Sequence, residues 1–135
     1  MKFTKDPKRR KIEKRLWEML KEISIIKSKG RCELCKGSGE QRDHCFSASK
    51  CTKLRFDHRN ITNLCGKCHS YKSYEIGGYE KKVDHIVLCR EGWEAWQDME
   101  KLALPDALFK WTLTMLEEKE VELKTKLEEL KHGND

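Results

Sequence analysis

The sequence predicts an α+β fold that is mostly helical, built around one small core. Three observations lead to this prediction. Apolar residues recur at helical spacing near both ends of the 135-residue chain, and between them two Cys-x-x-Cys pairs enclose a segment with short strand patterns. Hydrophobic residues make up 37% of the chain against 39% charged residues, so we expect a core that a bound metal would help to stabilise.

Residues 1–30 are predicted to hold a basic amphipathic helix that runs from Pro7 to about Lys29 and is ended by Gly30. Its apolar face comprises Ile12, Leu16, Met19, Leu20, Ile23 and Ile26. Residues 1–31 contain twelve Lys and Arg against four Asp and Glu, within a net charge of +6 for the chain. Such a surface favours binding to nucleic acid, although an anionic membrane surface or solubility alone would also explain it. The predicted phosphate contacts on this helix are Lys8, Arg9, Arg10, Lys11, Lys14 and Arg15.

Four cysteines have the spacing of a structural zinc site. Cys32 and Cys35 form one Cys-x-x-Cys pair, and Cys65 and Cys68 form another after 29 intervening residues. Two such pairs can surround one Zn²⁺ ion with four thiolates, and this closed site leaves no position for a catalytic water. A redox motif needs only one pair and is the weaker alternative. The other three cysteines are expected to be small buried apolar residues; these are Cys45, Cys51 and Cys89.

Residues 31–76 are expected to hold the functional site. We predict a strand over residues 41–46, a loop over 47–59, a strand over 60–64 and a helix over 66–74. Within this segment, Asp43 and His44 are adjacent, Asn60 follows His44 by sixteen residues, and His69 follows Asn60 by nine. Hydrolysis of a phosphodiester needs a base and a cation that neutralises developing charge. An imidazole can act as the base, and a carboxylate together with a second imidazole can bind the cation.

This order of residues resembles the HNH (His-Me finger) nuclease superfamily in its zinc-stapled form, over residues 30–75. The resemblance implies a ββα-metal finger and a metal-dependent DNA endonuclease. It also implies that His44 is the general base and that Asp43 and His69 hold one Mg²⁺ or Mn²⁺ ion. Asn60, the other catalytic-motif residue, fixes the geometry of the finger in many members of the superfamily and contacts the metal in others, and we favour the structural role. Because Asp43 and His44 would point to opposite sides of a regular strand, the end of that strand must be distorted.

A narrower resemblance is to the NinG/Rap recombination endonucleases of lambdoid phages. It rests on Asp43-His-Cys-Phe-Ser-Ala-Ser, Leu54-Arg-Phe-Asp, Asn60, the second cysteine pair, Tyr79, Gly92-Trp, and a tryptophan near position 17. His69 and Asp43 depart from that family's pattern toward the general HNH pattern. The resemblance implies branched recombination intermediates as substrates. Further phosphate contacts are expected at Arg55, Arg59 and Lys67, whereas Asp57 and His58 are expected to be solvated or capping.

The remainder of the chain is predicted to be helical. A helical extension over residues 77–104 contains helices at 79–89 and 91–104, and Trp93, Trp96 and Trp111 are expected in the core. Over residues 105–135, apolar residues alternate four and three apart, with Glu120 as the one polar interruption. Such a seam indicates either a helix that packs on its own domain or a coiled coil that forms a homodimer. Its positions are Phe109, Leu113, Leu116, Glu120, Leu123, Leu127 and Leu130.

Three functions remain open from the sequence. The first is an endonuclease acting on branched DNA, the second a general HNH nickase or restriction-like nuclease on duplex DNA, and the third a non-catalytic zinc-finger DNA-binding protein. No apolar stretch has the roughly 20 residues of a membrane span, and the chain begins without the apolar core of a signal peptide. We therefore expect a cytoplasmic protein of a bacterial or phage-infected cell, without membrane contact.

Overall fold

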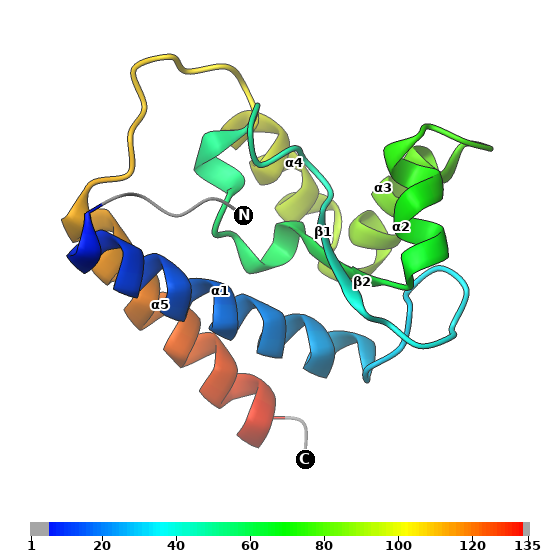
Figure 1. Cartoon of the computed structure of the whole chain (residues 1–135), viewed down its shortest axis with the longest axis horizontal. Coiled ribbons are helices and arrows are strands. Elements are labelled where there is room, and N and C mark those ends of the chain that lie inside the picture. The colour runs from blue at the N-terminus through cyan, green and yellow to red at the C-terminus, as the bar shows by residue number, and fades with distance from the viewer. Residues whose placement is uncertain (1–5, 134–135) are drawn as a thin grey trace.

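The fold is α+β and mostly helical, as predicted (Figure 1). The computed structural model describes residues 6–133. Within that range the elements are five α-helices, a two-stranded sheet and two short 3-10 turns. Their bounds are α1 Pro7–Ser28, β1 Gln41–His44, η1 Thr52–Leu54, η2 His58–Asn60, β2 Ile61–Leu64, α2 Gly66–Ser73, α3 Tyr79–Glu91, α4 Trp93–Leu102 and α5 Leu113–His132.

Helix α1 begins and ends where its sequence signals predict. The Asp6 side chain caps it by accepting a hydrogen bond from the Lys8 backbone N–H, and Pro7 occupies the first turn. At the other end, Lys29 and Gly30 both have positive φ values, of 57° and 75°, which stop the helix. Its apolar face is buried at Ile12, Leu16, Leu20 and Ile23.

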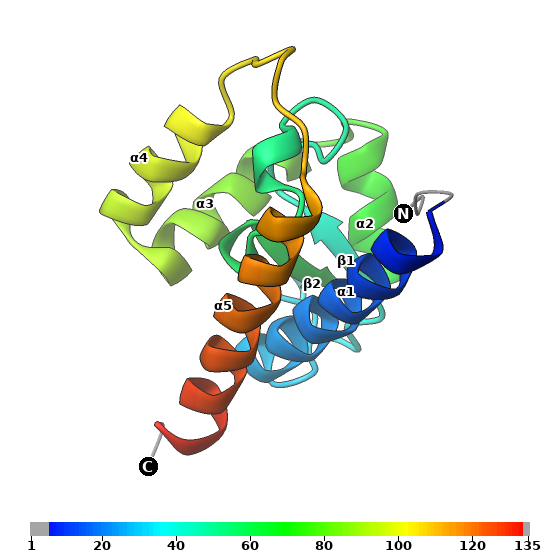
Figure 2. The ribbon, with the colours of Figure 1, turned by 90° about the vertical axis from the view of Figure 1, so that its left-hand side faces the viewer.

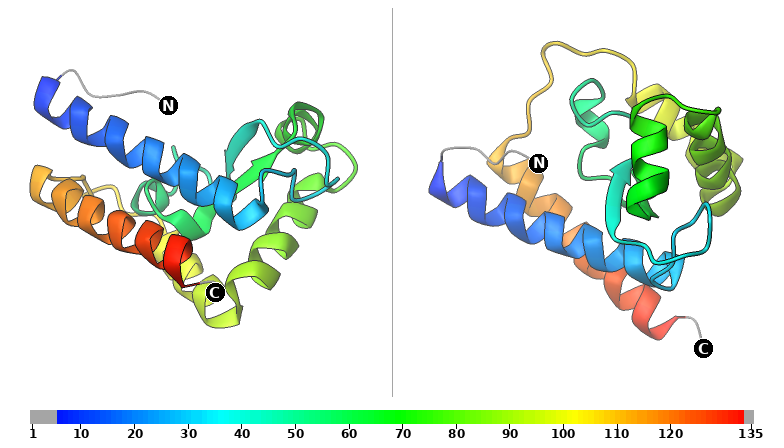
Figure 3. Two further views of the ribbon diagram at one scale, coloured as in Figure 1. Left: turned by 90° about the horizontal axis from the view of Figure 1, so that it is seen from below. Right: turned by 45° about the vertical axis from the view of Figure 1, so that its right-hand side comes forward.

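Helix α5 packs alongside α1, and the two run in the same direction (Figure 3). Arg9, near the start of α1, donates to the carbonyl of Trp111 just before α5, whereas Glu22 near the end of α1 pairs with Lys131. Leu116, Leu123 and Leu127 are buried in the core that the two helices share, and Leu113 and Leu130 pack against it. Of the two interpretations of the leucine seam, packing on its own domain is therefore observed, whereas dimerisation stays a prediction. Phe109 lies before the helix begins.

The strands β1 and β2 pair antiparallel, with Asp43 opposite Thr62 and His44 opposite Ile61. Every residue of β2 is buried. Ile61 faces the core formed with α1 and α5, which we call the arm core, whereas Leu64 belongs to a second core beneath the cysteines, which we call the finger core. The sheet thus lies between two hydrophobic clusters, with α1 and α5 crossing in front of it in Figure 2.

Helices α3 and α4 complete the finger core through Val83, Val87 and Met99, and Trp96 packs against them. The prediction that the tryptophans share one core is wrong. Trp93, the first residue of α4, is 59% exposed, and Trp111 packs against the arm core instead. Among residues 6–133, none of the helices combines the length and the apolar character needed to cross a membrane.

Candidate metal centre and catalytic cavity

The four cysteines of the two Cys-x-x-Cys pairs come together as one cluster. The Sγ atoms of Cys32, Cys35, Cys65 and Cys68 all lie within 4.8 Å of one another, and those of Cys35 and Cys65 are 3.6 Å apart. A tetrahedral zinc ion with Zn–S distances of about 2.3 Å places its sulfurs about 3.8 Å apart. The cluster therefore fits a structural metal ion such as zinc, and we call it the four-cysteine cluster.

Backbone N–H groups in both cysteine pairs point at sulfur. The Cys35 N–H donates to Cys32 Sγ, and the Cys68 N–H donates to Cys65 Sγ at the N-terminus of α2. Burial opposes ionisation of the Cys32 thiol, but the backbone N–H groups around it lower its pKa to about 7. The local fold thus favours the thiolate, the form that binds metal, at Cys32, whereas burial and the neighbouring cysteines raise the pKa of the Cys68 thiol.

Asp43 and His69 face each other across the junction of β1 and α2. Asp43 Oδ1 lies 3.3 Å from His69 Nδ1, and the Asp43 residue is 8% exposed. The Nδ1 atom is buried without a hydrogen-bond partner among the residues described, because its contact with the carboxylate lacks hydrogen-bond geometry. Neighbouring ligands of an octahedral ion with bond lengths of about 2.1 Å lie about 3 Å apart. The two donor atoms are therefore spaced as two ligands of one cation would be.

Lys72, which sequence reasoning missed, completes this arrangement. Its Nζ donates to Asp43 Oδ2 at 2.5 Å and to the His44 carbonyl at 2.8 Å, and its side chain is 12% exposed. The two oxygens of the Asp43 carboxylate thus have different neighbours: one binds the Lys72 ammonium and the other faces His69. Since His69 and Lys72 are three residues apart on α2, helical periodicity offered a signal for Lys72 once His69 was chosen.

His44 is held from two sides. Its Nε2 lies 3.0 Å from the Arg55 carbonyl, and its ring stacks on Trp17 of α1 with centroids 5.7 Å apart and planes inclined by 16°. A carbonyl only accepts hydrogen bonds, so Nε2 carries the proton and Nδ1 is left as the acceptor atom. Burial lowers the pKa of His44 and outweighs the opposing effects of the Arg55 carbonyl and Asp43. At neutral pH the ring is therefore a neutral base.

One cavity of about 340 Å³ brings these groups together, and we call it the Asp43 cavity. Asp43 reaches it toward α2 and His44 lies toward α1, in keeping with alternation along β1. The expected distortion of the strand end is therefore wrong: the strand pairs regularly through His44, and both residues still line the cavity. The cavity also exposes Arg42, whose guanidinium lies 3.4 Å from the Asn63 side-chain oxygen. Its walls are Arg42, Asp43, His44, Cys45, Ser47, Ala48, His69, Lys72 and Glu80.

Asn60 lies outside this cavity and is fully buried. Its side-chain oxygen accepts from the Phe46 N–H at 2.6 Å, and its amide donates to the carbonyls of Phe46 and Leu54. It thus ties the start of the loop between the strands, at Phe46, and its middle, at Leu54, to the end of η2 just before β2, which is a structural role.

The predicted phosphate contacts separate into two groups. Arg59 is bound to Asp57 and Asp98, Arg15 to Glu120, and Arg9 to the Trp111 carbonyl. In contrast, Lys8, Lys11, Lys14 and Lys67 are exposed, as is Arg10, whereas Arg55 is half-buried beside the Phe56 ring. The lysines of α1 are therefore the better placed to meet a polyanion.

Asp57 caps η2 as expected, by accepting from the Arg59 N–H, but it is only 7% exposed and so is not solvated. The adjacent His58 lies 2.9 Å from Lys27 Nζ. Of the unassigned cysteines, Cys45 is half-buried and donates to Asp84, and Cys51 is half-buried, so burial is partial for both. The expectation of burial is wrong for Cys89, which is exposed.

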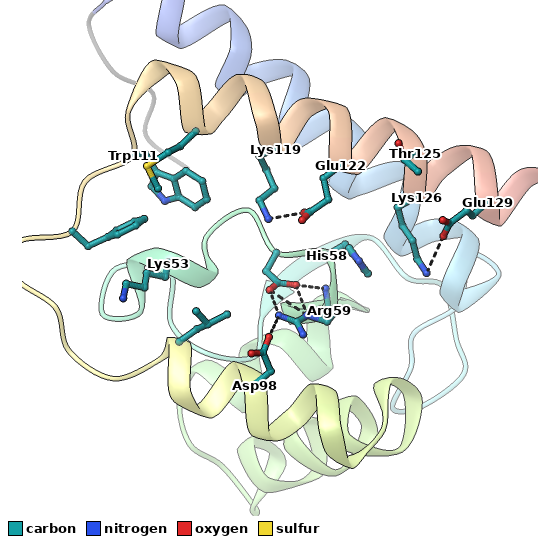
Figure 4. A pocket seen from close by; sticks show the side chains of 14 residues that line it. Lys53, His58, Arg59, Asp98, Trp111, Lys119, Glu122, Thr125, Lys126 and Glu129 are labelled. Carbon is teal, nitrogen blue, oxygen red and sulfur yellow. Dashed lines mark hydrogen bonds and ion pairs between the residues drawn. The ribbon is translucent and has the colours of Figure 1, made fainter.

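A wider cavity of about 750 Å³ opens between α4, α5 and the two 3-10 turns (Figure 4). Its polar groups are mostly paired: Arg59 with Asp98, Lys119 with Glu122, and Lys126 with Glu129. Neither Asp43, His44 nor His69 lines it. The larger cavity therefore contains none of these three candidate residues, and the smaller Asp43 cavity is the candidate catalytic site.

Comparison of the chain with protein-family models, with curated proteins and with solved structures found no match.

Proposed function

We propose that this chain is an HNH-type, metal-dependent DNA endonuclease that cleaves branched DNA. The observation that carries the proposal is the Asp43–His69 pair, in which a buried, unpartnered imidazole nitrogen faces a carboxylate oxygen at 3.3 Å beside the His44 base. A protein that used this segment only as a zinc-stabilised scaffold would not require that arrangement. The motif resemblance over residues 30–75 supports the same conclusion.

Asp43 and His69 would hold a divalent cation of the Mg²⁺ or Mn²⁺ class. When bound, such an ion neutralises charge on the phosphate and on the leaving oxygen. His44 accepts the proton of the attacking water at Nδ1, while the Arg55 carbonyl and the Trp17 ring keep its orientation. Lys72 holds the second oxygen of Asp43 and brings a positive charge to the wall of the cavity.

Branched DNA is proposed as the substrate on two grounds. The narrower resemblance is to enzymes of recombination intermediates, and the exposed lysines of α1 supply backbone contacts that carry no sequence information. A second copy of the chain would allow both strands of a branch to be cut.

The test is a cleavage assay on matched linear duplex, D-loop and four-way junction DNA, with Mg²⁺ or Mn²⁺ and with a chelator. We expect cleavage of the branched substrates, loss of cleavage in the chelator, and at least a hundredfold loss in His44→Ala. The control is His132→Ala, since His132 is exposed at the end of α5. Equal cutting of all three substrates would replace branch selectivity with general nicking.

One observation favours a second candidate, a non-catalytic zinc-finger DNA-binding protein. Lys72 already neutralises Asp43, so that the carboxylate has an internal partner without any metal. This candidate predicts tight DNA binding without cleavage under every metal condition, and binding that His44→Ala leaves unchanged.

A further inference from the structure

We infer that His85 and Cys89 on α3 form a second metal site, one that takes a soft or borderline divalent cation such as Zn²⁺, Co²⁺ or Cd²⁺. The two residues are four apart on one face of the helix, and both are exposed. Their ligand atoms, His85 Nε2 and Cys89 Sγ, lie 3.5 Å apart. Neither residue belongs to the four-cysteine cluster or to the Asp43 cavity, although Cys32 of that cluster lines the same groove as the pair. The inference does not rest on the proposed nuclease function.

The spacing matches that of two ligands on one tetrahedral ion. Zn–N and Zn–S distances of about 2.0 and 2.3 Å, at a tetrahedral angle, place nitrogen and sulfur about 3.5 Å apart. The pair therefore needs little rearrangement to chelate. On binding, the Cys89 thiol releases its proton and the thiolate and the neutral imidazole both donate to the ion, whose other positions remain open to water or small anions.

The surroundings of the His85–Cys89 pair lead us to expect a lower affinity for metal than at the four-cysteine cluster. The pair lines a groove of about 560 Å³ that also contains the exposed cations Lys29, Arg31 and Lys36. These charges oppose a divalent cation, and two protein ligands hold an ion less tightly than four. The same charges would favour an anion as the third ligand. A thiolate selects softer ions over Mg²⁺, so the catalytic ion is not expected here.

Metal binding at this pair would stiffen the segment that anchors the zinc finger. Directly after Cys89, Arg90 binds the carboxylate of Glu33, which lies between the cysteines of the first pair. Arg90 also donates to the Arg59 carbonyl. A chelate across one turn of α3 restrains the helix that carries this contact.

The experiment starts from the full chain loaded with one equivalent of Zn²⁺ and freed of excess metal. Titration with Cd²⁺ should then reveal one further equivalent through thiolate-to-metal charge-transfer absorption. Cys89→Ser should abolish that added absorption, and His85→Ala should weaken the binding about tenfold or more. Cys51→Ser is the matched control and should leave it unchanged, because Cys51 lines neither this groove nor the Asp43 cavity.

Released zinc is measured in parallel with a zinc-sensitive dye. If Cd²⁺ displaces zinc in proportion to the absorption, the signal comes from the four-cysteine cluster and the inference is wrong. Persistence of the absorption in Cys89→Ser, or absence of a second equivalent, would also overturn it. Far-UV circular dichroism of both variants establishes that each is folded.

Discussion

At the scale of single residues, the side chain with the least expected position is Lys72. Its ammonium donates hydrogen bonds to Oδ2 of Asp43 and to the His44 carbonyl, and the other oxygen of the carboxylate faces His69. The residue four positions after His69 is Ser73, so α2 offers no second imidazole one turn further on. Lys72 thus supplies positive charge at a site with few ligands, and it opposes cation binding at the same time.

We therefore expect Lys72→Met to bind Mn²⁺ at least as tightly as the wild type but to cleave DNA about tenfold more slowly or worse. Lys72→Arg should recover part of the rate. Mn²⁺ binding is followed by electron paramagnetic resonance and cleavage by gel assay. Lys101→Met, which is exposed on α4 and is not among the predicted phosphate contacts, is the charge-matched control. A parallel fall of Mn²⁺ affinity and rate would show that Lys72 only maintains the fold.

A second prediction concerns His58. Burial lowers its pKa to about 4, with further lowering by Lys27 and Lys126 and an opposing effect of Asp57 and Glu91. Because the folded pKa lies below the ordinary value of about 6.5, protonation favours the unfolded chain. Stability from the neutral ring is complete above that value and is lost as the pH falls from about 6.5 toward 4.

Thermal unfolding measured between pH 7 and 5 checks this. The wild type should lose stability more steeply with falling pH than His58→Gln, which has no titrating ring. Zinc release at low pH affects both proteins equally, so the difference between the two slopes isolates His58. Identical slopes would contradict the prediction.

At the scale of elements, the leucine seam shows what sequence reasoning reached and where it stopped. The heptad pattern fixed which face of α5 is apolar, and the buried Leu116, Leu123 and Leu127 confirm that face. The pattern could not identify the helix that packs against this face, because the same heptad pattern occurs whether that helix belongs to this chain or to a second copy of it. It also placed Phe109 in the helix, whereas α5 begins at Leu113 after the Thr112 cap.

Leu123→Ala should accordingly lower the free energy of unfolding by about 2–5 kcal/mol, as expected for a fully buried leucine. Glu120→Gln should cost less than about 1 kcal/mol, because its partner Arg15 is half exposed and surface ion pairs contribute little. Chemical denaturation of both variants provides the comparison. Comparable losses would indicate that α5 is held by the ion pair rather than by the leucines.

The elements of the candidate site also show which features sequence spacing predicts and which depend on the three-dimensional arrangement. Spacing along the chain identified the cysteine pairs, and the four-cysteine cluster is confirmed as a group able to hold a metal. It also predicted both strands and α2 within a few residues. Residue spacing could not predict contacts between distant segments. The stacking of Trp17 on His44, for example, joins residues that no local sequence pattern relates. The same holds for Arg59, whose acidic partner Asp98 lies on α4.

At the scale of the whole molecule, the two hydrophobic clusters are joined through the sheet and through charged groups. Ile61 and Leu64 of β2 belong to the arm core and the finger core respectively. Lys27 of α1 contacts Glu91 of α3 at 2.9 Å as well as His58 of η2. Burial lowers the pKa of Lys27, and Glu91 opposes that effect, so the ammonium depends on this partner.

Zinc removal should therefore unfold the molecule as one unit. Without metal, the thiols of the four-cysteine cluster no longer hold the first cysteine pair against α2, so Leu64 and the other apolar residues of the finger core lose their cover. The α1–α5 pair alone buries too little apolar surface to remain folded. We expect loss of α1–α5 helicity by circular dichroism to coincide, over a chelator titration, with exposure of Cys32 and Cys68 to a thiol reagent. Thiol exposure with helicity retained would instead show that the arm core folds independently, and β2 would then be the boundary between two separable units.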